Sequence, residues 1–220
     1  MVSPITIDLE LRHDSADAHL DSIPWLIKQF NCKVIAEIGV ERGALAKQVF
    51  EDCDGIIREY YLIDPWRPYD APLGTYFSQD KFKDYACWDD LALHVYGQFM
   101  DKARIIRLPS VFAAKLFADS GLDLVFIDAN HTRESVAEDI EAWLPKLKQA
   151  GILAGHDYDN KLFPGVREAV ESCFPKEIVE VLPGMVWYIE IAKAGRYRRS
   201  QGRKGDDIVA PIKSSPNFQE

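Results

Sequence analysis

Short apolar runs alternate along the chain with segments in which apolar residues recur every three or four positions. The short runs span residues 33–40, 59–66, 103–108, 122–129 and 151–158. The helical spacing is found in residues 15–31, 43–52, 110–121, 132–147 and 164–174. Strands rich in Val, Ile and Leu that alternate with helices predict a parallel sheet covered on both faces.

Two further runs, 177–182 and 186–193, flank Pro183-Gly184 and predict a terminal hairpin. The predicted fold class is therefore α/β, a single doubly wound, mostly parallel seven-stranded sheet with an antiparallel C-terminal hairpin. In the first helix, we expect Asp21 or Ser22 to be the N-cap and Pro24 to lie in the first turn.

Composition changes after Ala192. Residues 1–192 form the predicted domain, whereas residues 193–220 are first basic and then rich in Pro and Ser, which predicts a solvated extension. Residues 66–99 form an aromatic insertion that is too long for an ordinary connection, and it predicts a lid over the site. A homo-oligomer contact through the lid or the extension is a further expectation.

The chain has 220 residues and a net charge of −9, which argues against a sequence-independent nucleic-acid binder. No apolar run approaches the length of a membrane span, and the acidic N-terminal segment does not resemble a signal peptide. Four scattered cysteines without a Cys-x-x-Cys pair are typical of reduced thiols. We expect a cytoplasmic protein that acts on a small molecule.

Four predicted strands end in groups that resist burial. These are Glu37, Asp64, Asp128 and the pair His156-Asp157. In an open α/β sheet, ligands bind beyond the carboxyl ends of the strands. Four strands that deliver such groups to one edge therefore predict a functional site there.

The first of these strand ends, "EIGVERG", places Gly39 and Gly43 in a strand-to-helix turn. It is not the GxGxxG turn that cradles a diphosphate, and its two glutamates would repel a phosphate. An acidic turn with glycines suits a ligand that carries an amino group and a sulfonium. Asp64, at the end of the next strand, is placed to accept hydrogen bonds from a ribose diol.

With "EIGVERG", "YYLIDPW" and "LDLVFIDANH", the chain resembles the class I S-adenosylmethionine-dependent methyltransferases, which have a Rossmann-like fold. The resemblance covers roughly residues 33–192. It implies that Glu37, Gly39 and Gly43 line the methionine and ribose part of the cofactor, and that Asp64 takes the ribose hydroxyls. It also implies that Ser110 contacts the adenine.

The last two strand ends carry the predicted chemistry. Asp128 and Asp157 can share one divalent cation, because hard cations such as Mg²⁺ take carboxylate ligands. A substrate hydroxyl on such an ion loses its proton more readily. His131, three residues after Asp128, is the predicted general base, with a pKa near its ordinary value of ~6.5.

The resemblance is sharper to the small metal-dependent O-methyltransferases of sugar and macrolide tailoring and to cephalosporin-hydroxylase-like proteins. It implies that "DANH" supplies a metal ligand, Asp128, and the base, His131. After the fifth strand the chain has His156-Asp157 where those relatives have two acidic residues. Either His156 is a ligand, which favours Mn²⁺ or Zn²⁺, or Asp128 and Asp157 hold Mg²⁺ with more water.

The predicted function is metal-assisted O-methyl transfer from S-adenosylmethionine to a hydroxyl of a sugar or small natural product. Two alternatives remain open at this point. One is an oxygenase with a non-haem iron held by His131, His156 and one aspartate. The other is a non-catalytic protein that binds S-adenosylmethionine and acts as an assembly partner.

Overall fold

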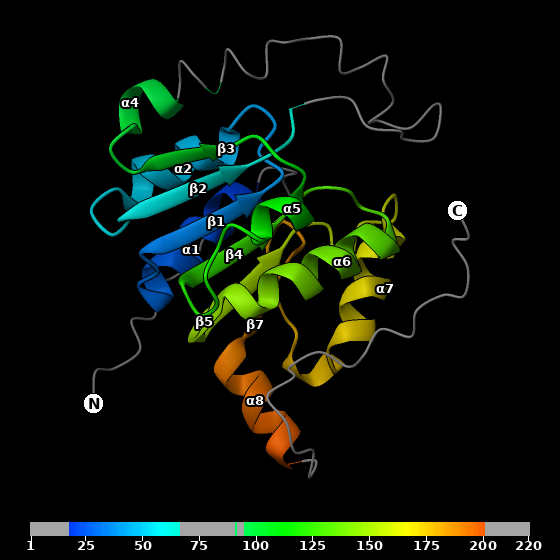
Figure 1. Cartoon of the computed structure of the whole chain (residues 1–220). Coiled ribbons are helices and arrows are strands. Elements are labelled where there is room, and N and C mark those ends of the chain that lie inside the picture. Colours follow the sequence, from blue (N-terminus) through cyan, green and yellow to red (C-terminus); the bar gives the residue numbers. More distant parts are fainter. Residues whose placement is uncertain (1–17, 67–90, 92–94, 201–220) are drawn as a thin grey trace.

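The computed structural model describes residues 18–66, 91 and 95–200. Its centre is one seven-stranded sheet of order β3-β2-β1-β4-β5-β7-β6 (Figure 1). The strands are β1 (Val34–Ile38), β2 (Glu59–Ile63), β3 (Ala103–Ile106), β4 (Leu122–Ile127), β5 (Leu147–Gly155), β6 (Glu180–Leu182) and β7 (Val186–Glu190). The first five strands are parallel to one another, and β7 pairs antiparallel with both β5 and β6. The predicted fold class is confirmed.

Helices cover both faces of the sheet and divide the core into two layers (Figure 1). One layer packs under α1 (His19–Phe30) and α2 (Ala44–Cys53), and Leu91 and Val95 complete it before the short α4 (Gly97–Phe99). The other layer packs under α5 (Ser110–Ala114), α6 (Arg133–Trp143), α7 (Pro164–Cys173) and α8 (Ile191–Ser200). Two 3₁₀ turns, η2 (Leu144–Lys146) and η3 (Lys176–Ile178), precede β5 and β6. Because both faces are covered, the central strands β1 and β4 are almost wholly buried.

Register brings the polar strand ends together at one edge. Ile38 at the end of β1 is level with Ile63 of β2 and with Ile127 of β4, and Ile127 is level with Gly155 of β5. The residue after each of these positions therefore leaves the sheet at the same edge. This is the edge at which the sequence predicts a ligand site.

The start of α1 differs from the prediction. The helix begins one turn earlier than expected, its N-cap is Ala18 without a side-chain hydrogen bond, and Pro24 lies inside the helix. The hydroxyl of Ser22 donates to the carbonyl of Pro183, at a distance of 2.8 Å. Ser22 therefore ties α1 to the turn between β6 and β7, and a long-range partner replaces the local capping contact.

The end of the chain also differs from the prediction. The final strand stops at Glu190, and residues 191–200, for which the sequence predicts strand and then a solvated extension, form α8 instead. Ala194 is buried, and Tyr197 packs against the core. Ala194 and Tyr197 are three residues apart, a helical spacing that is not evident in a segment of basic composition. Because both residues pack on the core, the domain continues past Ala192. Residues 201–220 lie outside the described part of the chain.

Most of the predicted lid, residues 66–99, lies outside the described residues, including Tyr69, Tyr76 and Phe77. Cys32, Cys53 and Cys173 are buried free thiols, as predicted, and Cys87 lies outside the description.

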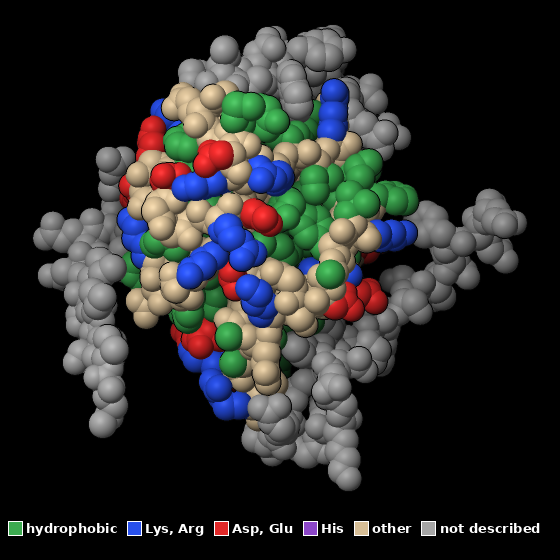
Figure 2. Space-filling view, turned by 60° about the vertical axis from the view of Figure 1, so that its left-hand side comes forward, with side chains coloured by type: hydrophobic (Ala, Val, Ile, Leu, Met, Phe, Trp, Pro, Cys, Tyr) green, Lys and Arg blue, Asp and Glu red, His purple; other side chains and the backbone are tan. Residues whose placement is uncertain are grey.

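One face of the molecule carries apolar and basic side chains next to each other (Figure 2). Four large apolar side chains on or beside α5 are exposed, namely Leu108, Val111, Phe112 and Leu116. Among the described helices, none combines the length and apolar character needed to cross a membrane.

Candidate functional site

Gly39 and Gly43 form the turn between β1 and α2, and both have a left-handed backbone, with φ of +86° and +76°. A side chain at Gly39 would collide with the carbonyl group of Asp128, and a Cβ at Gly43 would lie 2.7 Å from Cδ1 of Leu91. Both positions therefore require glycine for the fold itself, before any ligand is considered. The expected approach of a cofactor to this backbone stays a prediction.

The carboxylate of Asp64 holds the same turn. Its Oδ2 accepts hydrogen bonds from the backbone N–H groups of Val40 and Glu41, at 3.0 and 3.1 Å, and its Oδ1 accepts from the N–H of Trp66 at 2.7 Å. The indole N–H of Trp66 donates to the carbonyl of Glu41. A carboxylate has about four lone-pair sites, so Asp64 retains capacity for the predicted ribose hydroxyls.

Glu37 lies deeper than the turn. Its side chain is buried, and its Oε2 accepts a hydrogen bond of 2.8 Å from the hydroxyl of Tyr60. Burial raises the pKa of Glu37 to about 8, although the Tyr60 hydrogen bond acts in the opposite direction. The carboxyl of Glu37 is therefore held in the core by Tyr60 of β2, and the predicted contact with the cofactor stays a prediction.

The hydroxyl of Ser110 points into the contact between α5 and α6. It accepts a hydrogen bond of 2.8 Å from Nε1 of Trp143, and it also hydrogen-bonds the buried carboxyl of Asp139. Burial raises the pKa of Asp139 to about 7. Because protein groups engage this hydroxyl, its first role is to join two helices. Its predicted contact with adenine stays a prediction.

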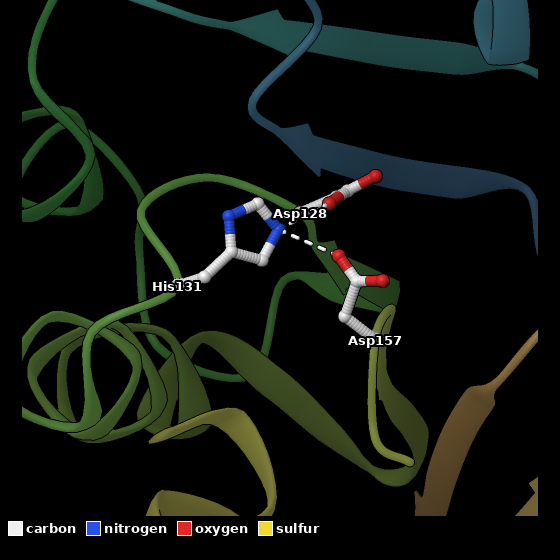
Figure 3. A group of neighbouring side chains, drawn as sticks. All are labelled: Asp128, His131 and Asp157. Atoms are coloured by element: carbon white, nitrogen blue, oxygen red, sulfur yellow. Dashed lines mark hydrogen bonds and ion pairs between the residues drawn. The ribbon is translucent and has the colours of Figure 1, made fainter. Parts of the chain in front are cut away.

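Asp128, His131 and Asp157 meet at the ends of β4 and β5 (Figure 3). Nε2 of His131 lies 2.8 Å from Oδ2 of Asp157 and 3.2 Å from Oδ1 of Asp128. One ligand atom from each of the three residues lies within 4.8 Å of the others. Two carboxylates and one imidazole form a donor set that fits a divalent cation.

His156 borders this cluster and belongs to the predicted metal site. Its Nδ1 lies 3.4 Å from Oδ2 of Asp128 and 3.6 Å from Oδ2 of Asp157, and its buried Nε2 has no hydrogen-bond partner among the described residues. Its ring lies against that of His19 at the start of α1, with 4.5 Å between the centroids. The ring nitrogen of His131 therefore lies closer to both carboxylates than that of His156.

The four titratable groups shift one another's pKa. Burial would raise the pKa of both aspartates, but their hydrogen bonds and the positive charges of His131 and His156 together outweigh it and lower the pKa of Asp128 and Asp157 below the ordinary range. Burial would lower the pKa of His131, yet its hydrogen bonds to the two carboxylates raise the pKa to about 9. The pKa of His156 is raised by the same carboxylates. The expectation of an ordinary pKa for His131 is therefore wrong for the site without a metal, because two anions flank the imidazole.

Sequence reasoning missed several residues that shape this site. The phenyl ring of Phe163 stacks on the imidazole of His131, and the side-chain amide of Asn160 donates to Oδ1 of Asp157 at 2.7 Å. His19 approaches from α1. No local pattern marks these residues, because each contact joins segments that are distant in the chain or folded back by an irregular loop.

A family model described as "Methyltransferase domain" matches residues 36–158, which is more than half of the chain and includes the glycine turn and both aspartates of the cluster. The chain belongs to this methyltransferase family. The prediction of a class I S-adenosylmethionine-dependent methyltransferase is confirmed.

Solved structures with the same fold include several methyltransferases. A putative caffeoyl-CoA O-methyltransferase from Staphylococcus aureus has a TM-score of 0.55 and 20% identity, over 78% of this chain and 82% of that chain. CalS11, a calicheamicin methyltransferase, has a TM-score of 0.58 and 18% identity, over 83% and 82% of the two chains. Its apo structure is described as that of a TDP-rhamnose 3'-O-methyltransferase. At this identity the likeness shows a common fold.

The chain is also similar in sequence to a protein from Sinorhizobium fredii, described as uncharacterized protein y4gI. The two are 25% identical over 138 residues, which cover 60% of this chain and 14% of that protein. The methyltransferase chain thus matches only a small part of a much longer relative.

Proposed function

We propose that this methyltransferase transfers the methyl group of S-adenosylmethionine to a hydroxyl oxygen of a sugar or small natural product, with the help of a divalent metal. The observation that carries the proposal is the cluster of Asp128, His131 and Asp157 beside the glycine turn. The backbone of Gly39 contacts that of Asp128, and the N–H of Asp128 donates to the carbonyl of Ile38 at 2.8 Å. A methyl donor on the turn and an acceptor on the cluster would therefore be neighbours.

Asp128 and Asp157 are the proposed metal ligands, with His156 as a third, so that Nε2 of His131 stays available as the base. A dication held there would lower the pKa of a hydroxyl that it binds. Mg²⁺ fits the two carboxylates, and Mn²⁺ or Zn²⁺ fits a set that includes an imidazole. Within the described part of the chain, the buried Nε2 of His156 has no hydrogen-bond partner, which is consistent with a site that needs a further polar group.

The residues of the cluster account for the path of the proton. The acceptor oxygen forms a bond to the methyl carbon while the carbon–sulfur bond breaks, and sulfur keeps the bonding electrons. The hydroxyl proton must then leave. His131 accepts it at Nε2 when that nitrogen is neutral, and the flanking carboxylates of Asp128 and Asp157 stabilise the imidazolium that results.

The choice of a sugar or natural-product hydroxyl rests on likeness alone. CalS11 shares the fold and is described as acting on the 3' position of TDP-rhamnose. The Staphylococcus aureus protein shares the fold as well and is described as a putative caffeoyl-CoA O-methyltransferase. Both descriptions name methyl transfer to an oxygen atom, which is the shared chemistry that we propose for this chain.

Calorimetric titration with S-adenosylmethionine, followed by methyl transfer from labelled cofactor to nucleotide sugars, glycosides and phenols with Mg²⁺ present, tests the proposal. Label in an acid-stable ether product supports it. Cofactor binding without transfer to any acceptor would favour the non-catalytic alternative. Fe²⁺-dependent oxidation without cofactor binding would favour the iron alternative.

A further inference from the structure

The loop after β5 reaches across to the loop after β4 and places an aromatic ring on the proposed base. The rings of Phe163 and His131 are stacked, with 4.3 Å between their centroids and 20° between their planes. Phe163 also packs against the hydrophobic core. His131 is thus held by carboxylates at Nε2 and by a phenyl ring on one face.

The backbone gives Phe163 little freedom to move away. Its N–H donates to the carbonyl of Asn160 at 3.0 Å, and its carbonyl accepts from the N–H of Val166 at 3.1 Å. Pro164 follows at the first turn of α7 and restricts the backbone of the preceding residue. Asn160 is itself tied to Asp157, so the loop that carries the ring is fixed to the same cluster.

Gly165 supplies an independent observation of the same contact. A Cβ at this position would lie 2.6 Å from the backbone nitrogen of Arg133 and 2.9 Å from the carbonyl oxygen of His131. The first turn of α7 therefore packs directly on the backbone of the His131 loop, and only glycine leaves room for it. This close approach is what brings the neighbouring Phe163 over the imidazole.

We infer that Phe163 is a positioning residue for His131, an inference that rests on the proposed function of His131 as the base. The second side-chain torsion of histidine has a broad energy minimum, so an imidazole without a neighbour rotates readily. The stacked phenyl ring restricts that rotation and keeps Nε2 directed at Asp128 and Asp157. Proton transfer requires this direction, whereas cofactor binding at the glycine turn does not.

The test compares Phe163→Leu, which keeps an apolar group but removes the ring, with Phe163→Tyr, which keeps the stack. We expect Phe163→Leu to lower kcat by up to about 10²-fold, the cost of a small misplacement of a reacting group. The Kd for S-adenosylmethionine should be unchanged, and Phe163→Tyr should restore kcat. Phe30→Leu is the matched control, because Phe30 contacts Tyr188 at the C-terminal end of α1. Wild-type kcat in Phe163→Leu would overturn the inference.

A second measurement does not depend on activity. Ring protons of His131, assigned by their loss in His131→Ala, should show a ring-current shift in the NMR spectrum that disappears in Phe163→Leu and persists in Phe163→Tyr. Identical His131 resonances in the wild type and Phe163→Leu would refute the stack. If the resonances move but the wild type transfers no methyl group, the proposed function fails while the contact stands, and Phe163 then has no base to position.

Gly165→Ala probes the same contact from the backbone. The added methyl group should push α7 away from the His131 loop, and we expect the NMR change and the loss of kcat seen in Phe163→Leu. Thermal unfolding of each variant separates this effect from a general loss of folding. A folded Gly165→Ala with wild-type His131 resonances would contradict the proposed packing.

Discussion

Gly39 lies directly against the backbone carbonyl of Asp128, so the turn predicted to bind the cofactor and the strand end that carries the acidic cluster are in contact. Any side chain at Gly39 must displace one of them. We expect Gly39→Ala to lower the free energy of unfolding by about 1–3 kcal/mol for its left-handed backbone alone, with the collision in addition. Cofactor affinity should fall with it.

Gly55→Ala is the matched control for this prediction, because nothing lies within 4 Å of a Cβ at Gly55. Urea unfolding and calorimetry with S-adenosylmethionine measure both effects. A Gly39→Ala protein as stable as Gly55→Ala would show that the two loops do not pack in this way.

Asp64 is predicted to act both in the turn and in cofactor binding. Asp64→Ala leaves the N–H groups of Val40, Glu41 and Trp66 without their acceptor, and we expect the affinity for S-adenosylmethionine to fall by roughly 1–3 kcal/mol. Asp52→Ala removes an exposed hydrogen bond with Gln48 and serves as the control. Unchanged affinity in a folded Asp64→Ala protein would rule out the ribose assignment.

Removal of the metal should abolish methyl transfer without abolishing the binding of S-adenosylmethionine. Chelation with EDTA is expected to stop methyl transfer and to leave the Kd for S-adenosylmethionine largely intact, because the proposed ion serves the acceptor. Mg²⁺ or Mn²⁺ at 100 times its Kd should stabilise the fold by about 2.7 kcal/mol in thermal unfolding. Asp157→Asn should lose this stabilisation. Full transfer after exhaustive chelation would refute the metal site.

Metal binding should also depend on pH. Burial opposes the charged form of His131, but the two carboxylates dominate and raise its pKa to about 9, so without a metal the imidazole is protonated at neutral pH. A cation between the carboxylates competes with that proton. The apparent metal affinity should therefore rise with pH up to about 9, and binding should release protons. Calorimetry in buffers of different ionisation enthalpy measures the release; a pH-independent affinity would contradict it.

His131→Ala tests the base itself. Loss of a positioned base typically costs about 10²–10⁴ in rate, and we expect that loss in kcat with near-normal affinity for S-adenosylmethionine. His156→Ala should instead alter the preference among Mg²⁺, Mn²⁺ and Zn²⁺ if His156 is a ligand. Wild-type turnover by His131→Ala on an identified acceptor would assign the base to another group.

Glu37 should make stability fall as pH rises. Burial raises its pKa from 4.5 to about 8, so between these values the native state keeps a proton that the unfolded state has lost. The free energy of unfolding should therefore decrease across this window, by at most about 1.4 kcal/mol per pH unit from this group. The difference between wild type and Glu37→Gln in urea unfolding isolates the effect. If the free energy of unfolding varied with pH in the same way in the wild type and in Glu37→Gln, Glu37 would have an ordinary pKa in the folded protein.

The sequence was sufficient for the fold because the deciding signals are local. Apolar runs of strand length and the helical spacing between them are each set by neighbouring residues. The N-cap of α6 is local as well, because the side chain of Thr132 accepts from the N–H of Ser135. Parallel strands share a carboxyl edge, so the placement of Asp64, Asp128 and Asp157 at one edge of the sheet followed from topology. The sequence also suggested Gly39 and Gly43, whose left-handed backbones are local properties.

Only the tertiary structure decided how the side chains at that edge are paired. His131 lies closer than His156 to Asp157, and the hydroxyl of Ser110 faces Trp143, because helix packing sets these directions. The stack of Phe163 on His131 depends on the close approach of α7 at Gly165. α8 is helical because packing against the core outweighs a basic composition that by itself favours solvent. Contacts between segments distant in the chain leave no periodic trace in the sequence, and these contacts set the chemistry of the site.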